Sequence, residues 1–245
     1  MNVSWVPASH PPPLGEDVHV WIWKTPLKTD QDAGNVAILS PEERSRMMRF
    51  RFTRDGRRYL TSHANMRRLL ASYSDCTPRE LAFVVNEYGK PRLRKLRRGK
   101  PLYFNLSHSD DLGLLAVTRM GDVGADIECI RPIEPYVAEE HFSATELEQL
   151  KTLTGDAWLA GFYRCWTRKE AILKAEGCGL NLPLGAFDVS LLPGEPAALR
   201  AVRPEIHLSR QWKLANLAPE AGVIGAVAAD ESYTELQQFW LADQV

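Results

Sequence analysis

Apolar and polar side chains alternate along several short segments of the chain, which is the pattern typical of β-strands. Residues 123–130, VGADIECI, show it most clearly, with Val123, Ala125 and Ile127 separated by other residue types. Because strand side chains point to opposite faces in turn, Asp126 and Glu128 must point to the same side. The same reasoning predicts strands, some with a connecting turn, within 18–23, 81–93, 101–119, 185–192, 211–218 and 222–230.

Other segments have the three-to-four residue spacing of amphipathic helices. Residues 40–50 begin with Ser40 as a candidate cap, and residues 54–74 form a longer helical pattern. Residues 141–150 carry a capping box in Ser143 and Glu146. Residues 156–177 form the strongest pattern, with Asp156 expected to cap the helix and Gly177 to end it. The chain therefore has two halves of similar length that each mix helices and strands, with a boundary expected near 119–122.

The composition is that of an ordinary globular protein. Of 245 residues, 44% are hydrophobic and 25% are charged. No apolar run approaches the roughly 20 residues of a membrane helix, and the Pro-rich residues 1–17 lack the pattern of a signal peptide, so we interpret them as a poorly ordered lead-in. The four cysteines form no CxxC pair and no metal-binding spacing. Reduced thiols and a cytoplasmic location are expected.

The charges are divided unevenly between the two halves. Residues 1–120 contain 20 Lys and Arg against 12 Asp and Glu, and residues 121–245 contain 10 against 19. A basic half beside an acidic half suits a polyanionic ligand on one side and a metal ion on the other, although chance asymmetry would look the same. Nucleic-acid binding is not expected, because the whole chain is not basic and has no known binding motif.

Acidic side chains provide the first candidate chemistry. Asp126 and Glu128 would repel each other unless a cation lay between them. Glu170 and Lys174 are spaced i, i+4 and share one face of the strongest helix. If that helix packs on the 123–130 strand, Glu170 becomes a third carboxylate in a site suited to Mg²⁺ and phosphate oxygens. The alternative is a solvated Glu–Lys pair that contributes little.

Two short motifs lie upstream of these acids. FNLSHS (104–109) places His108 near the end of a strand, where it could donate a hydrogen bond to a phosphate or simply be a surface residue. EYGKP (87–91) places Lys90 in a turn. The chain contains no GxxxxGK[ST], HExxH or GxSxG motif, so P-loop, zinc-peptidase and serine-hydrolase chemistry lack support.

In this order, EYGKP, FNLSHS, VGADIE and WTRKEAILKAEG resemble the motifs of the 4′-phosphopantetheinyl transferases of the Sfp type, in the subgroup with W-x-x-K-E-A. The match runs from about residue 40 to residue 190. The resemblance implies an α+β fold of two similar subdomains in a pseudo-twofold arrangement, with the active site in the cleft between them. Residues 1–120 would form the coenzyme A nucleotide side, and residues 121–245 the side of the metal-binding acids and the carrier protein.

The resemblance also implies an activity. A member of this family transfers the 4′-phosphopantetheine arm of coenzyme A to a serine of an acyl or peptidyl carrier protein and releases adenosine 3′,5′-bisphosphate. Coenzyme A would be the co-substrate and Mg²⁺ the cofactor, with Mn²⁺ as a possible substitute. A monomer is expected, because one chain supplies both sides of the cleft, and neither nucleic acid nor membrane is an expected partner.

Several positions match the family's site residues. The resemblance assigns metal binding to Asp126, Glu128 and Glu170, and catalysis to Glu170, Lys174 and Asp126. Glu170 would be the base that activates the carrier serine, and Lys174 would stabilise the departing phosphate. The positions assigned to coenzyme A are Arg46, Gly89, Lys90, Pro91, Asn105, Ser107, His108 and Lys174. One departure is Glu43, where some members carry a second basic residue.

Two other functions remain open at this point. Another Mg²⁺-dependent phosphoryl or nucleotidyl transferase would explain the acids but not the joint presence of EYGKP and FNLSHS. A non-catalytic carrier- or coenzyme-binding protein is less well supported, because Asp126, Glu128, Glu170 and Lys174 are all intact.

Overall fold

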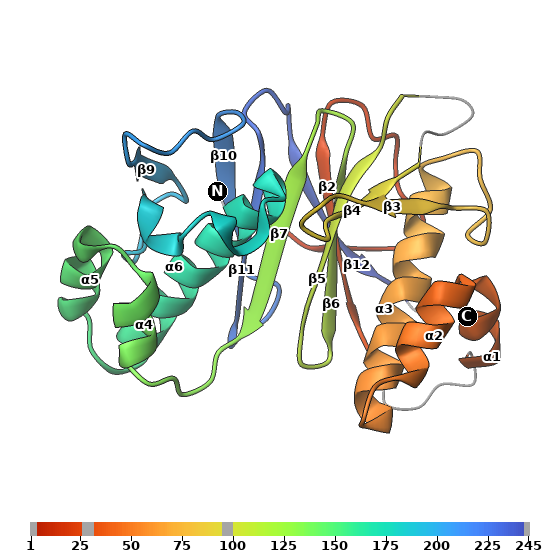
Figure 1. Ribbon diagram of the computed structural model, residues 1–245, viewed down its shortest axis with the longest axis horizontal. Coiled ribbons are helices and arrows are strands. Elements are labelled where there is room, and N and C mark those ends of the chain that lie inside the picture. The colour runs from red at the N-terminus through yellow and green to blue at the C-terminus, as the bar shows by residue number, and fades with distance from the viewer. Residues whose placement is uncertain (1–3, 26–31, 95–99, 243–245) are drawn as a thin grey trace.

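In the computed structural model, helices and strands are mixed along the whole chain (Figure 1). The structure describes residues 4–25, 32–94 and 100–242. The first half contains β1 (Val6–Ala8), β2 (Val18–Lys24), α1 (Asp32–Ile38), α2 (Pro41–Met48), α3 (Thr53–Ser72), β3 (Phe83–Val85), β4 (Pro91–Leu93), β5 (Tyr103–Ser109) and β6 (Leu112–Thr118). The second contains β7 (Val123–Cys129), α4 (Tyr136–His141), α5 (Ala144–Lys151), α6 (Gly155–Glu176), the short 3₁₀ helices η1 (Gly179–Asn181) and η2 (Leu184–Ala186), β8 (Phe187–Val189), β9 (Leu199–Val202), β10 (Trp212–Leu217), β11 (Val223–Asp230) and β12 (Leu236–Leu241). The expected α+β fold class is confirmed.

Two sheets form the centre of the molecule. One has the strand order β1-β12-β2-β6-β5, and the other has the order β10-β11-β7. Figure 1 shows them side by side, with α1–α3 outside the first sheet and α4–α6 outside the second. The arrangement is therefore helix, sheet, sheet, helix, and the strand β7 lies at the boundary between the halves.

The alternation along β2 explains how the layers pack. Val18, Val20 and Ile22 belong to a buried cluster that also includes Ile127 of the second sheet. Trp21, whose side chain points the opposite way, belongs to the cluster under α3. Because β2 buries both of its faces, the two halves share one of their cores and cannot separate without exposing it to water.

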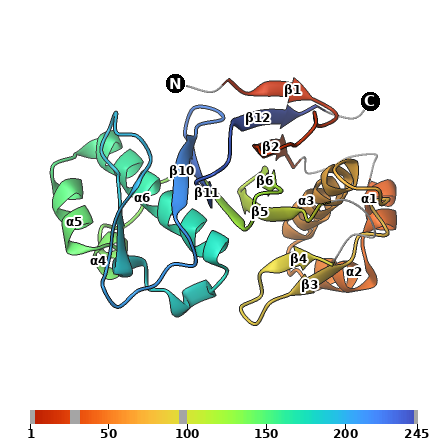
Figure 2. The same cartoon turned by 90° about the horizontal axis from the view of Figure 1, so that it is seen from above.

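The structure of the two chain ends contradicts one expectation from the sequence. Residues 1–17 were interpreted as a lead-in, but β1 pairs in parallel with β12, and β12 pairs in parallel with β2 (Figure 2). That interpretation is wrong for Val6–Ala8, because a partner more than 200 residues away supplies the hydrogen bonds that no local pattern announces. The division at residue 120 stays a prediction, and β12 from the far end of the chain lies in the sheet of the first half.

Three helix ends follow the local chemistry that the sequence predicts, and one does not. Capping boxes form at Ser40 with Glu43 and at Ser143 with Glu146. Gly177 ends α6 with φ +68°, a left-handed conformation that glycine adopts without strain. Asp156 does not cap α6: the capping position is Thr154, and Asp156 lies in the first turn, where its charge still favours the helix dipole.

The four cysteines, at positions 76, 129, 165 and 178, are free thiols. Burial raises the pKa of the Cys165 thiol well above its ordinary value, so this side chain behaves as a small apolar residue in the core. Within the described ranges, no helix is both long and apolar enough to cross a membrane.

A buried histidine in β2 makes stability sensitive to pH. His19 is fully buried, its Nδ1 contacts the Tyr73 hydroxyl at 2.8 Å, and Trp21 donates to the same hydroxyl at 2.7 Å. The pKa of His19 is lowered from 6.5 to about 4, because burial disfavours the charged ring and Asp17 only partly opposes this. The folded chain thus binds this proton more weakly than the unfolded chain does.

The free energy of unfolding should therefore fall as the pH drops from about 6.5 toward 4. Between pH 7 and pH 5 we expect His19 to account for a loss of about 2 kcal/mol. Urea unfolding of the wild type and His19→Gln at both pH values checks this, because all other groups titrate alike in the two proteins. An equal pH dependence in the two proteins would contradict it.

Candidate functional site

Side chains from β5 join the two sheets along a seam beside β7. Asn105 accepts a hydrogen bond from the Ala125 backbone N–H at 2.8 Å, and Ser107 donates to Asp126 Oδ1 at 3.1 Å. Ser109 donates to Glu128 Oε2 at 2.8 Å. These β5 residues are spaced by two, so all three point toward β7. The seam thus holds Asp126 and Glu128 in place through side chains rather than a backbone ladder.

Helix α6 brings the remaining charged groups to this seam. Glu170 and Lys174 lie one turn apart, and Lys174 Nζ lies 2.5 Å from Asp126 Oδ1 and 3.1 Å from Ser107 Oγ. Together with the neighbouring side chains they line a cavity of about 340 Å³, whose full lining is Leu106, Ser107, His108, Asp126, Glu128, Trp166, Glu170 and Lys174. The packing of this helix on β7, on which the third carboxylate depended, is present.

Gly124 allows α6 to approach β7 this closely. A Cβ atom at this position would lie 2.0 Å from the Ala171 carbonyl oxygen and 2.3 Å from the Ala175 nitrogen. Both atoms belong to the helix backbone and cannot rotate away. The glycine is therefore required by the contact between strand and helix, two residues before Asp126.

Two fully buried cations hold α6 on its other side. Arg168 donates to the backbone carbonyl and hydroxyl of Ser190 and to Asn216 Oδ1. Lys169 forms an ion pair with Glu146 at 2.8 Å and donates to the carbonyls of Leu184 and Phe187. The lysine of the W-x-x-K-E-A motif thus anchors the helix, while the glutamate that follows it faces the seam.

Breaking the Lys169–Glu146 pair should be costly. Lys169→Met leaves a carboxylate buried without its cation, and we expect it to lower the free energy of unfolding by about 3–5 kcal/mol in urea titrations. Lys151→Met is the matched control, since its ion pair with Glu148 is exposed and should contribute little. A loss in Lys169→Met no greater than in the control would contradict the anchoring role.

The electrostatics of the cavity are dominated by negative charge. Burial is the largest cause that raises the pKa of Glu170. The negative charges of Asp126 and Glu128 raise this pKa further, and the positive charge of Lys174 lowers it. Burial and Asp126 likewise raise the pKa of Glu128. Asp126 Oδ2 is buried and has no hydrogen-bond partner among the described residues. Three carboxylates therefore face one ammonium group, and at least one carboxylate oxygen is unsatisfied.

No group of three His, Cys, Asp or Glu side chains within residues 4–25, 32–94 and 100–242 is arranged to hold a metal ion as it stands. Instead, the Lys174 ammonium lies on Asp126. Asp126, Glu128 and Glu170 nevertheless line one cavity, and its unsatisfied oxygen and excess negative charge suit a divalent cation. The metal assignment stays a prediction.

At the basic end of the cavity, His108 lies near α3. The pKa of His108 is lowered by desolvation first and then by Lys174, His63 and Arg58. Arg46 lies over the Tyr59 ring at 5.8 Å, and this ring stacks on His63. Lys174, Arg58 and Arg46 are cations that suit an anionic ligand, and the assignments of Arg46 and His108 stay predictions.

Glu43, the departure from the family pattern, has a structural role. It accepts from the Ser40 backbone N–H at 2.8 Å, pairs with Arg67 at 2.7 Å and contacts His63 at 3.1 Å. Arg67 is almost fully buried. The acid at position 43 therefore caps α2 and neutralises a buried cation.

The EYGKP turn lies beside the C-terminal end of α6. Gly89 has φ +86°, and Asn86 accepts from the backbone N–H groups of Tyr88 and Lys90. Lys90 points inward, donating to the Ala175 carbonyl at 2.7 Å and to Asp122. A groove of about 240 Å³ runs past this turn, and its lining is Tyr88, Gly89, Lys90, Pro91, Asn105, Glu170, Leu173, Lys174, Gly177 and Gly179. The coenzyme A assignments of Gly89, Lys90 and Pro91 stay predictions, and the Lys90 ammonium is engaged within the protein.

Sequence reasoning missed three contributors to this region. Ser109 continues the every-second-residue pattern of Asn105 and Ser107, so the spacing along 104–109 could have identified it. Trp166 lines the cavity one turn before Glu170, a spacing visible in the helix pattern. Asn86, which orders the turn and donates to the Gly177 carbonyl at 2.7 Å, had no such signal.

Comparisons with known proteins give the same family for both halves of the chain. A family model for the 4′-phosphopantetheinyl transferase superfamily matches residues 122–228, and one for the N-terminal part of 4′-phosphopantetheinyl transferases matches residues 23–120. The chain is 34% identical over 197 residues to a putative 4′-phosphopantetheinyl transferase, slr0495, of Synechocystis sp., covering 80% of this chain and 78% of the relative. It is 33% identical over 231 residues to the 4′-phosphopantetheinyl transferase HetI of Nostoc sp., covering 92% and 93%. It is 32% identical over 166 residues to the 4′-phosphopantetheinyl transferase Sfp of Bacillus subtilis, covering 68% and 72%.

Proposed function

We propose that this chain, which belongs to the 4′-phosphopantetheinyl transferase superfamily, carries out its reaction at the seam between β5, β7 and α6. The enzyme transfers the 4′-phosphopantetheine arm of coenzyme A to a serine of a carrier protein and releases adenosine 3′,5′-bisphosphate. The observation that supports this location is the convergence of three carboxylates and Lys174 on one cavity that continues toward a second groove.

Asp126, Glu128 and Glu170 would hold a divalent cation, Mg²⁺ or in its place Mn²⁺. The unpartnered, buried Oδ2 of Asp126 supports this, as do the pKa values of Glu128 and Glu170, which burial raises first and the neighbouring carboxylates raise further. When bound, the cation neutralises the diphosphate and the charge gained by the leaving group.

Glu170 is the proposed general base. The carrier serine oxygen attacks the phosphorus that bears the pantetheine arm, and the bond from that phosphorus to the oxygen of the nucleotide phosphate breaks. A serine hydroxyl is a weak nucleophile at neutral pH, so its proton must leave as the bond forms. The raised pKa of Glu170 makes its carboxylate a stronger base than an exposed one.

Lys174 would stabilise the leaving phosphate. Its ammonium already lies at the seam, 2.5 Å from Asp126 and 3.1 Å from Ser107, and its side chain is partly accessible. A cation in this position offsets the negative charge that develops on the departing oxygen. Asp126 orients Lys174 and completes the acidic set.

Coenzyme A would extend from this cavity along residues of the first half. Ser107 and His108 would donate to its phosphates, and Arg46 would contact the nucleotide end. Asn105 and the turn formed by Gly89, Lys90 and Pro91 line the adjoining groove. The Lys90 side chain is buried, so the contact we propose for this residue is through its backbone.

We further propose a monomer in the cytoplasm. Both sides of the site come from one chain, so no second copy is needed to complete it. The four free cysteines are typical of a reducing compartment. The acyl or peptidyl carrier protein would be the macromolecular partner.

Intact-mass spectrometry of an apo acyl carrier protein tests the function. The carrier is incubated with this protein, coenzyme A and Mg²⁺, and a parallel sample contains EDTA. We expect the carrier to gain one phosphopantetheine arm only when the metal is present. No gain on any of several apo carriers, with a folded enzyme, would overturn the proposed function, while an undiminished gain in EDTA would overturn only the metal requirement.

A further inference from the structure

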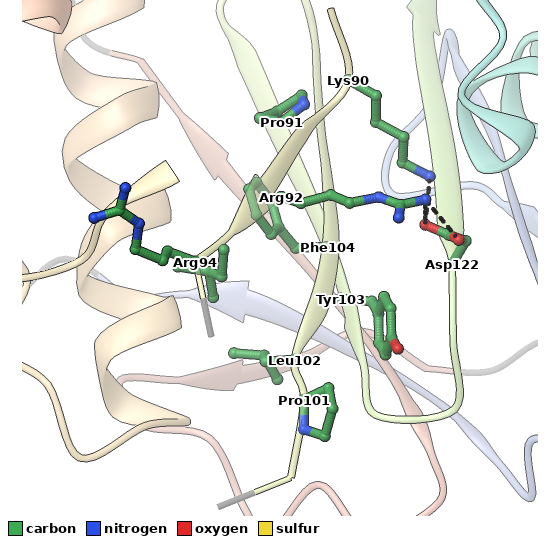
Figure 3. Close-up of a pocket in the computed structure, with 10 residues that line it drawn as sticks. Lys90, Pro91, Arg92, Arg94, Pro101, Leu102, Tyr103, Phe104 and Asp122 are labelled. Atoms are coloured by element: carbon green, nitrogen blue, oxygen red, sulfur yellow. Dashed lines mark hydrogen bonds and ion pairs between the residues drawn. The ribbon is translucent and has the colours of Figure 1, made fainter. Parts of the chain in front are cut away.

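A second cavity lies between β4 and β5, with Asp122 at one side (Figure 3). Its volume is about 290 Å³, at the lower end of the range for small-molecule sites. Its lining is Lys90, Pro91, Arg92, Leu93, Arg94, Pro101, Leu102, Tyr103, Phe104 and Asp122. It shares Lys90 and Pro91 with the groove described above but none of the acidic residues at the seam.

The walls of this cavity are mostly apolar. Leu102 and Phe104 are buried, and Pro91, Pro101 and the Tyr103 ring complete the surface around them. Figure 3 shows the Arg92 side chain extending across the cavity toward Asp122, with the Tyr103 ring on the Asp122 side of β5 and the Leu102 and Phe104 side chains on the other side. A ligand would therefore contact apolar walls and meet a guanidinium group at one end.

Arg92 retains hydrogen-bonding capacity. One of its terminal nitrogens, Nη2, donates to both Asp122 oxygens, at 3.0 and 2.9 Å. Its Nε and Nη1 atoms have no hydrogen-bond partner in the part of the chain that the structure describes, and about half of its side chain is exposed (48%). A guanidinium group has five N–H donors in a planar fork, so these free donors can bind a carboxylate.

The charge balance favours a single negative charge on the ligand. Lys90 and Arg92 are cationic and both contact Asp122, which leaves an excess of one positive charge among these three groups. Lys90 is fully engaged, since its ammonium also donates to the carbonyls of Val123 and Ala175. Arg94 points its guanidinium away from Arg92 (Figure 3). Arg92 is therefore the group that would receive the anion.

We propose that the cavity between β4 and β5 is a second binding site, separate from the catalytic cleft, for a small monocarboxylate with a short apolar body. The carboxylate binds the free donors of Arg92, and the apolar body lies against Pro91, Pro101 and the Tyr103 ring. The Tyr103 hydroxyl, which has no partner within the described ranges, lies on the same wall and can donate as well. The site does not depend on the transferase activity.

Calorimetric titration with 4-phenylbutyrate tests this proposal on the full chain. We expect saturable binding of one molecule per chain, weakened about tenfold or more by Arg92→Gln, because a charge-assisted hydrogen bond is lost. The neutral analogue 4-phenylbutan-1-ol should bind at least about tenfold more weakly for the same reason. Arg92 is half-exposed, so the variant should fold, and its thermal unfolding is measured alongside.

Two controls separate this cavity from other sites. Arg200→Gln removes an exposed, ion-paired arginine of the second half and should leave binding unchanged. Saturating coenzyme A should also leave it unchanged, because the catalytic cavity has a different lining and the adjoining groove shares only Lys90 and Pro91 of the residues that line this cavity. The proposal would be overturned if no saturable binding were seen up to about 10 mM, because a Kd of about 10 mM is already very weak. Displacement by coenzyme A, or equal affinity in Arg92→Gln, would also overturn it.

Discussion

Replacement of Glu170 by Gln is expected to lower kcat by at least about a hundredfold, because a positioned general base typically contributes this much or more. The amide has the size of the carboxylate but cannot accept the serine proton. Glu170 lies in the cavity with Asp126 and Glu128, and its pKa is raised by burial and by those two charges. Initial rates of carrier modification, at saturating coenzyme A and Mg²⁺, measure the effect.

The pH profile adds a readout that a merely structural role would not change. If Glu170 must be ionised, activity falls as the pH drops through its raised pKa, and Glu170→Gln removes this acid limb. Glu148→Gln is the matched control, because Glu148 is an exposed residue of α5 outside the site. Near-normal turnover of Glu170→Gln at saturating Mg²⁺ would overturn its assignment as the base.

The second large effect is expected from Gly124→Ala. The added methyl group would overlap the backbone of α6 at Ala171 and Ala175, so strand and helix must move apart. We expect a loss of about 3 kcal/mol in the free energy of unfolding, at the upper end of the usual cost of overpacking, and a loss of activity, since the displacement moves Glu170 and Lys174 away from Asp126. Urea unfolding and carrier modification assays measure the two consequences.

Gly34→Ala is the control for this substitution. Gly34 lies in α1, and alanine favours the helix by about 1 kcal/mol over glycine. Among the described residues, no atom outside its chain neighbours and the backbone of its own helix lies within 4 Å of the position of its added Cβ. The same chemical change should therefore be neutral or stabilising there. A Gly124→Ala protein with wild-type stability and activity would show that the strand and the helix are not in the contact described.

Local sequence was sufficient for most elements and for the identity of the charged site residues. The alternation along 123–129 correctly placed Asp126 and Glu128 on one side of β7, because a strand projects alternate residues to opposite faces. The i, i+4 spacing of Glu170 and Lys174 placed both on one face of α6. The cap at Ser40 and the capping box at Ser143 were also predicted correctly, because each involves only residues a few positions apart.

Only the tertiary structure decided how these pieces meet. The pairing of β1 with β12 joins opposite ends of the chain, and the β5–β7 seam depends on which sheet edges face each other. Lys90 was expected at the nucleotide, yet its ammonium lies inside, because the Ala175 and Val123 carbonyls and Asp122 surround it. Periodicity along a chain determines the face of an element, whereas its partners depend on contacts between residues far apart in sequence, which no local pattern encodes.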